Sequence, residues 1–188
     1  GIPRKNLRPI AGHPLIYYSI HACLAATNVD VVAVSTDDEE IALFAERFGA
    51  LVLMRPAELA DDLTTLDPVI AFAVAQAEKD LETTFDAVVT VQPTAPLISP
   101  GHINDAVRHL QRRDIDTVLS VVDNRHLNWT IVDGVPVPQY AARVNRQLLP
   151  HCFKETGAII ACSRAQLMTG TRIGGSVHLL EIPHDKSI

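Results

Sequence analysis

An arginine directly follows one apolar run of this sequence and is held by the proline after it. Arg55 follows the run 50–54 and precedes Pro56, which restricts the Arg55 backbone to an extended form. A guanidinium fixed in this way suits a nucleotide base or a phosphate, to which it can donate parallel hydrogen bonds. The alternative is an ion pair with Glu58, and the sequence leaves both interpretations open.

An amide and a hydroxyl follow a second apolar run, 87–91. They belong to Gln92 and Thr94, in a loop that Pro93 and Pro96 stiffen. Polar groups fixed in direction at the end of a strand suit a sugar or a carboxylate ligand. The alternative is a rigid crossover loop that binds nothing.

Lys5 and Asn6 lie just before the first predicted helix, on a loop that can curl over the same edge of a sheet. A lysine on a loop is a movable point charge for phosphate. Taken alone, Lys5 is better described as a solvated surface residue. Its assignment to a site therefore depends on Arg55, Gln92 and Arg146 following it in register along the chain.

These side chains need elements that position them, and the sequence alternates short apolar runs with longer amphipathic segments. The predicted strands cover 30–35, 50–54, 87–91, 117–122, 156–161 and 177–182. The predicted helices cover 13–26, 36–48, a segment that Asp67-Pro68 opens, and 99–112. Thr36 is the predicted cap of the second helix, in a capping box with Glu39, and Asp67 is the predicted cap of the third.

The alternation implies βαβ units and hence an α/β fold, with three layers around a mostly parallel, doubly wound sheet. The 188 residues suit a single domain, 1–188. Ligands of such sheets bind beyond the carboxyl ends of the strands, where Arg55, Gln92 and Thr94 are expected. The region 123–150 breaks the pattern, because it holds three prolines and a hairpin turn signal at Asp133-Gly134. We expect this region to leave the sheet.

Composition argues against several classes of protein. The formal net charge of -6 disfavours a nucleic-acid or anionic-membrane surface. Three cysteines without a CxxC pair argue against a disulfide framework or a thiolate zinc site, and favour a reduced, cytoplasmic setting. No apolar run reaches the roughly 18 residues of a membrane span, and no signal peptide is visible. The eight histidines are dispersed, without the spacing of a metal site.

Taken in order along the chain, the motifs resemble those of the acylneuraminate cytidylyltransferase family, which makes CMP-activated sialic acids and related sugars. The family's opening pattern has its counterpart in 3–15, its STDDEEIA strand end in 35–42, its RPAELA segment in 55–60 and its QPTxPL loop in 92–97. Each motif alone is modest evidence. The ordered set spans nearly the whole chain and makes the resemblance specific.

The resemblance implies a nucleotide-diphospho-sugar transferase-like fold and one reaction. In that reaction the anomeric hydroxyl of a 2-keto sugar acid attacks the α-phosphate of CTP, which yields a CMP-sugar and pyrophosphate. The implied nucleotide-binding residues are Lys5, Asn6, Arg55 and Thr65, with Lys5 also catalytic. The implied sugar-binding residues are Gln92, Thr94 and Arg146, the last through the sugar carboxylate.

The resemblance also implies CTP, a nonulosonic acid, Mg²⁺ and a second copy of the chain as partners. Region 123–150 corresponds to the family's dimerisation extension, so Arg146 is expected to act in the partner's site. The family's glycine-rich triphosphate loop and its Asp-x-Asp metal pair have no counterpart here. Both are expected beyond the two ends of the chain, with the Mg²⁺ ligands beyond residue 188 and none assigned within it.

The identity of the sugar acid stays open at this stage. Aromatic residues that some sialic-acid members carry near positions 160 and 174–175 are missing, which favours a different nonulosonic acid. The nearest alternative is a 3-deoxy-manno-octulosonate cytidylyltransferase, although that family has Gly-Asp-Glu-Pro where this chain has 92–96. The other alternative is a non-catalytic nucleotide- or sugar-binding homologue.

Overall fold

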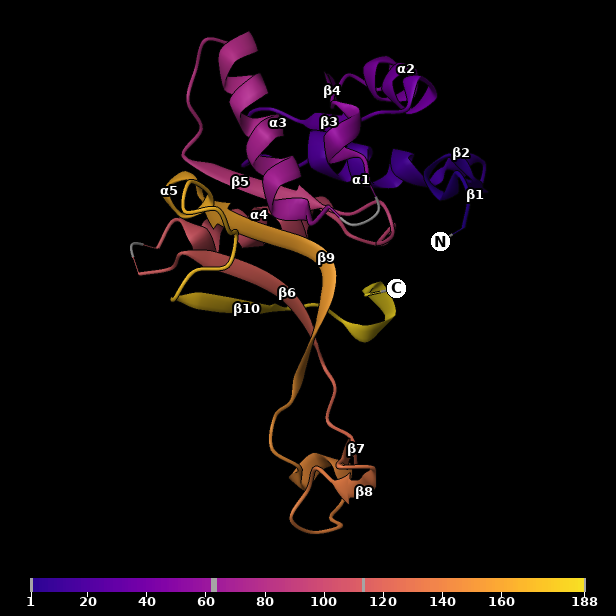
Figure 1. Ribbon diagram of the computed structural model, residues 1–188, viewed down its shortest axis with the longest axis vertical. Helices are drawn as coiled ribbons and strands as arrows, with labels where there is room; N and C mark the ends of the chain where they lie inside the picture. The colour runs from indigo at the N-terminus through magenta and orange to yellow at the C-terminus, as the bar shows by residue number, and fades with distance from the viewer. Residues whose placement is uncertain (1, 62–63, 113, 188) are drawn as a thin grey trace.

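The computed structural model describes residues 2–61, 64–112 and 114–187. Two sheets form its central layer (Figure 1). The larger sheet has the strand order β10 (Val177–Glu181), β6 (Thr117–Asp123), β9 (Phe153–Ser163) and β5 (Ala87–Val91). The smaller sheet pairs β3 (Ala33–Thr36) with β4 (Leu51–Met54), and a short hairpin of β1 (Pro9–Ile10) and β2 (His13–Pro14) lies near the N-terminus.

The larger sheet is mixed in direction. β10 runs parallel to β6, whereas β9 runs antiparallel to both β5 and β6. A parallel connection needs a crossover of a dozen or more residues, usually a helix, and no α-helix lies between β6 and β9. The predicted α/β class is confirmed. The sheet was predicted to be mostly parallel and is mixed, because β9 runs antiparallel to both of its neighbours.

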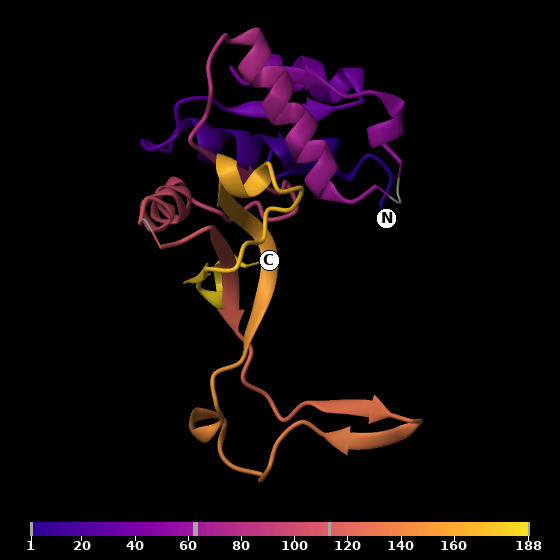
Figure 2. The ribbon, with the colours of Figure 1, turned by 60° about the vertical axis from the view of Figure 1, so that its left-hand side comes forward.

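Helices cover both faces of the two sheets, which gives three layers (Figures 1 and 2). On one face pack α1 (Leu15–Leu24), α2 (Glu39–Arg47) and α4 (Pro100–Leu110), and on the other pack α3 (Leu66–Asp80) and α5 (Arg164–Leu167). α1 and α3 each contact both sheets, so they hold the two sheets in one domain. None of the helices in the described ranges is long and apolar enough to cross a membrane.

Two of the predicted helix caps were wrong by two residues each. Asp38, not Thr36, caps α2, because its Oδ1 accepts from the N–H groups of Glu40 (2.8 Å) and Ile41 (3.2 Å). Thr36 instead accepts from the N–H of Asp38 at 3.1 Å. α3 begins at Leu66, so Asp67 lies inside its first turn, where its carboxylate pairs with the buried Arg172.

Region 123–150 leaves the sheet as predicted and forms an extended arm, residues 124–152 (Figure 2). β6 and β9 stay paired beyond a bulge at Leu119/Val121, and their far ends lead into the arm. The arm carries the hairpin of β7 (Trp129–Val132) and β8 (Val135–Pro138) and the short helix η3 (Arg146–Leu148). Asp133 and Gly134 both have positive φ, 50° and 80°, as the predicted two-residue turn requires.

Candidate active site

A cavity of about 1080 Å³ lies between the two sheets, along β3 and β5. We call it the inter-sheet cavity. Five of the seven residues predicted from the sequence to form a site line it, and they come from three separate segments of the chain. These residues are Lys5, Asn6, Arg55, Gln92 and Thr94.

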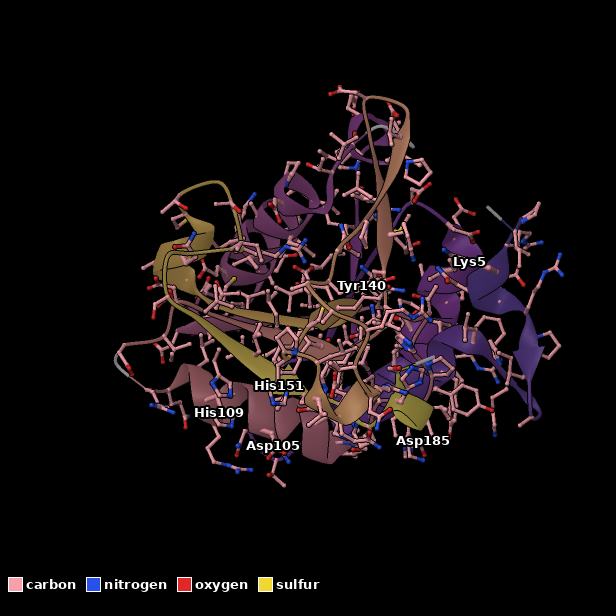
Figure 3. The ribbon with its side chains drawn as sticks, turned by 90° about the horizontal axis from the view of Figure 1, so that it is seen from below. Lys5, Asp105, His109, Tyr140, His151 and Asp185 are labelled. Carbon is pink, nitrogen blue, oxygen red and sulfur yellow. The ribbon has the colours of Figure 1, made fainter. Side chains whose placement is uncertain are left out.

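The N-terminal tract reaches the inter-sheet cavity because several contacts hold it. Residues Lys5–Leu7 form a single 3-10 turn, which Arg4 opens in a left-handed conformation with φ 52°. The Arg4 guanidinium pairs with Glu40 of α2, and the Leu15 N–H donates to the Arg8 carbonyl at 2.9 Å. Lys5 is exposed on this segment (Figure 3). The turn thus presents an ammonium group at the polar end of the cavity.

Arg55 is held by Asp37 across the carboxyl ends of β4 and β3. Its Nη2 and Nε donate to Asp37 Oδ1 at 2.6 Å and 3.1 Å. The hydrogen bond from Arg55 is the main cause that lowers the pKa of Asp37 below its usual value. The ion pair with Glu58 that the sequence left open is therefore not the one formed. Asp37 fixes the direction of the Arg55 guanidinium, and the Arg55 side chain as a whole is only 24% exposed.

Backbone hydrogen bonds hold the loop after β5 at both ends of its first turn. The Gln92 N–H continues the sheet by donating to the Ala158 carbonyl at 3.1 Å, and the Ala95 N–H closes a turn onto the Gln92 carbonyl at 3.1 Å. The Thr94 hydroxyl lies 3.5 Å from Gln92 Oε1. Both side chains are thereby held together at the carboxyl end of β5, where they face the inter-sheet cavity.

Two predicted site residues lie elsewhere. Thr65 is exposed at the start of α3 and does not line the cavity, although its neighbour Leu66 does. Arg146 lies on the arm, away from the cavity of its own chain. Residues 160 and 174–175, at which missing aromatics had favoured a different sugar, do not line it either.

Two hydroxyls that sequence reasoning passed over belong to the same region. Ser35 Oγ and Thr90 Oγ1 are buried without a hydrogen-bond partner in the described chain, as is Asn6 Oδ1, and all three residues line the cavity. A buried polar atom without a partner costs about 1–3 kcal/mol, so such atoms point to a group that binds there. The sequence signal for these two hydroxyls was a serine or threonine in a mainly apolar run, Ser35 in 30–35 and Thr90 in 87–91.

The volume of the inter-sheet cavity, about 1080 Å³, is close to the upper end of the roughly 300–1,000 Å³ that ligand pockets occupy, and its polar end suits a ligand.

An α/β domain with cationic and amide side chains gathered at the carboxyl ends of its strands has the architecture of a nucleotide-binding fold. The model of the cytidylyltransferase family matches residues 1–156. The chain therefore belongs to the cytidylyltransferase family.

Individual relatives agree with this assignment. N-acylneuraminate cytidylyltransferase B of Danio rerio is 31% identical over 100% of this chain and 45% of its own length. The 3-deoxy-manno-octulosonate cytidylyltransferase of Anaeromyxobacter sp. (strain Fw109-5) is 32% identical over 88% of this chain and 64% of its own. The expected resemblance to acylneuraminate cytidylyltransferases is confirmed, and the chain spans less than half the length of the first of these relatives.

A solved structure supports the fold. The CMP:2-keto-3-deoxy-manno-octonic acid synthetase complexed with CTP superimposes with a TM-score of 0.68. The alignment covers 96% of this chain and 84% of that one, at 16% sequence identity. At this identity the likeness concerns the fold alone, and it agrees with the three-layer α/β architecture.

Proposed function

We propose that this chain is the core of a cytidylyltransferase that transfers CMP from CTP to the anomeric hydroxyl of a sialic acid or related nonulosonic acid and releases pyrophosphate. One observation carries the proposal. Lys5, Asn6, Arg55, Gln92 and Thr94, which are far apart in the sequence, all line the inter-sheet cavity. Family membership and the 31% identity to an N-acylneuraminate cytidylyltransferase support the same reaction.

The chemistry of these residues suits the proposed reaction. The hydroxyl oxygen forms a bond to the α-phosphorus while the bond to the departing pyrophosphate breaks, so negative charge grows on phosphate oxygens. Lys5 and Arg55 supply positive charge for that change, which is the kind of electrostatic stabilisation that lowers such barriers. Asn6 and Thr65 contact the nucleotide in this proposal. Gln92 and Thr94 orient the acceptor sugar through their amide and hydroxyl groups.

The proposed reaction uses Mg²⁺, which would neutralise phosphate charge when bound. The carboxylates at the polar end of the cavity do not fit as its ligands. Asp37 is engaged by Arg55, and Asp38 caps α2. Nor do the described residues bring three histidine, cysteine, aspartate or glutamate side chains together as a metal-binding group. We therefore propose that the Mg²⁺ ligands lie outside the described residues.

Measuring pyrophosphate release tests the proposed function. The full-length protein is incubated with CTP, Mg²⁺ and a panel of sialic, legionaminic, pseudaminic and deaminated nonulosonic acids, with 3-deoxy-manno-octulosonate alongside. We expect release that requires both CTP and a nonulosonic acid. Release with the octulosonate alone would favour the alternative cytidylyltransferase. If no acid supports release, the chain is the non-catalytic homologue and the proposal is wrong.

Asp37 is proposed to act on the reaction through Arg55. In the full-length enzyme, Asp37→Asn should raise the KM for CTP about tenfold, which corresponds to about 1.4 kcal/mol. The physical reason is that Asp37 holds the guanidinium by two hydrogen bonds. Glu58→Gln is the matched control, because Glu58 is the other carboxylate that the sequence places near Arg55. A wild-type KM in Asp37→Asn, with kcat also unchanged, would contradict this positioning role.

The arm suits a homodimer, and we propose that it makes one in a cytoplasmic setting. It carries exposed apolar side chains, among them Trp129 (56%), Ile131 (64%) and Leu148 (72%). Exposed apolar patches of this kind mark protein interfaces. In the proposed dimer, Arg146 reaches the partner's cavity and binds the sugar carboxylate.

Changing one apolar side chain of the arm should separate the dimer. We expect Ile131→Glu to shift the protein from dimer to monomer in light scattering coupled to gel filtration, because the substitution would bury an unpaired charge. Leu43→Glu on α2 is the control, because Leu43 is equally exposed, at 61%. Monomers in the unchanged protein, or equal effects of both substitutions, would rule out this interface.

A further inference from the structure

β9 bends sharply beside the carboxyl end of β5 (Figure 1). Its residues 159–163 pair with β5, whereas its residues 153–155 pair with β6 alone. Between these two halves, one residue of β6, Ser120, lies opposite four residues of β9, 156–159. A bulge re-aims a strand but leaves backbone groups without ladder partners, so the polar groups of this segment need partners of another kind.

Two side-chain hydroxyls supply these partners. Ser120 Oγ accepts from the Ile159 N–H at 2.8 Å and donates to the Ile159 carbonyl at 3.0 Å. Because a hydroxyl has a single proton, Thr156 must then be the donor in its contact of 2.6 Å with Ser120 Oγ. Thr156 Oγ1 in turn accepts from the Ala158 N–H at 3.2 Å. The two hydroxyls thus replace ladder hydrogen bonds across the bulge.

The residues of the bulge lie directly beside Gln92. The Ala158 carbonyl accepts from the Gln92 N–H at 3.1 Å. Gly157 has a positive φ of 68°, which glycine adopts at no steric cost. A Cβ at Gly157 would lie 3.9 Å from Gln92 Nε2, so the side-chain amide of Gln92 rests on the bulge. The shape of the bulge therefore affects both the backbone and the side chain of Gln92.

The two hydroxyls can influence a ligand only through another residue. Neither Ser120 nor Thr156 lines the inter-sheet cavity, whereas Gln92 does. The simplest alternative is that the hydroxyls only support the fold, because a buried backbone group without a partner costs about 1–3 kcal/mol. A test must therefore include a measurement that a loss of stability alone would not change.

We propose that Ser120 and Thr156 are positioning residues for the acceptor sugar. Their hydroxyls hold the bulge of β9 beneath Gln92 and thereby aim the Gln92 amide at that sugar. The inference rests on the proposed function, in which Gln92 orients the acceptor. Hydrogen bonds weaken steeply as their angles depart from linear, so a shift of the Gln92 amide should weaken binding of the acceptor. The nucleotide contacts of Lys5 and Arg55 should stay as they are.

Steady-state kinetics of the full-length enzyme test this role. Thr156→Val removes the hydroxyl and keeps the branched shape of the side chain, whereas Thr156→Ser keeps the hydroxyl. Thr156 is chosen because it is half-buried, whereas Ser120 is only 2% exposed. Thr171→Val is the matched control. Thr171 is also half-buried, its Oγ1 also accepts from one backbone N–H at 3.2 Å, that of Ile173, and it does not line the cavity.

The expected result is a change confined to one substrate. Thr156→Val should raise the KM for the acceptor acid about tenfold, with kcat and the KM for CTP changed by less than about twofold. Thr156→Ser and Thr171→Val should behave like the unchanged enzyme. A hydroxyl that only supports the fold would affect both substrates together. An unchanged KM for the acid in Thr156→Val, or equal increases for both substrates, would overturn the proposal.

Amide hydrogen exchange of the substrate-free, full-length protein gives a second measurement by NMR. The amides of Gln92 and Ala158 should exchange at least about tenfold faster in Thr156→Val than in Thr156→Ser. The amide of Val88, which is further along β5 and pairs with Cys162, should be unchanged. Equal exchange of Gln92 in the two variants would show that the hydroxyl does not hold it. This measurement needs no turnover, so it decides the point even if no acid supports pyrophosphate release.

Discussion

Lys5→Ala is expected to slow CMP transfer by the full-length enzyme about 100- to 1,000-fold, the usual loss when one preorganised group that stabilises transition-state charge is removed. Lys5 is the ammonium group among the residues that line the inter-sheet cavity. Its charge meets the phosphate oxygens on which negative charge grows, so the loss should appear in kcat as well as in kcat/KM.

The thermal stability of the protein should be unchanged in Lys5→Ala. Lys5 is exposed, and within the described ranges it takes part in none of the ion pairs. Lys79→Ala is the matched control, because Lys79 is an exposed lysine at the end of α3 that does not line the cavity. Pyrophosphate release and thermal unfolding are measured for both variants. A near-normal rate in Lys5→Ala would remove Lys5 from the site.

The second large effect concerns stability. Gly174→Ala should destabilise the protein by about 3 kcal/mol, because the added methyl group overpacks a closed site. A Cβ at Gly174 would lie 2.4 Å from Asp116 Cβ and 2.8 Å from Gln166 Oε1. Neither neighbour can withdraw freely. Asp116 Oδ2 accepts from the Ser176 N–H at 3.0 Å, and the Gln166 amide donates to the Thr171 carbonyl at 2.9 Å.

Gly175→Ala provides the control for this prediction at the next residue. A Cβ at Gly175 meets nothing within 4 Å, and neither glycine needs a positive φ. The free energy of unfolding of Gly175→Ala should stay within about 0.5 kcal/mol of the unchanged protein. Urea denaturation measures both variants. Equal urea midpoints for Gly174→Ala and Gly175→Ala would contradict the prediction and show that the packing at Gly174 can relax.

Local sequence patterns predicted most of the elements, because the signals are themselves local. The Ser99-Pro100 start of α4 is confirmed, with Ser99 accepting from the His102 N–H at 3.4 Å. The Asp133-Gly134 turn follows from the tolerance of these residues for positive φ. The cap of α2 was misplaced because Thr36 and Asp38 both offer an oxygen within one turn. Backbone dihedral angles decide between them, and the sequence does not contain those.

The direction of β9 was not predicted, and the reason is its connection. An apolar run reads the same in either direction, so only the segment that joins it to the preceding strand indicates parallel or antiparallel pairing. Here that segment is the arm, which contains a hairpin and no α-helix. Parallel strands need a crossover connection, usually a helix. Because the arm supplies none, β9 returns antiparallel beside β6.

The sequence by itself determined the α/β class, the family motifs and the polar residues that follow each strand, since these depend on residue types and their order. Tertiary structure alone decided which of those residues meet. Asp37 rather than Glu58 holds Arg55, because the carboxyl ends of β3 and β4 lie side by side. Lys5 reaches the inter-sheet cavity with Gln92, whereas Arg146 lies on the arm, away from the cavity of its own chain. Distances between segments far apart in the chain are set by packing, and no local pattern encodes them.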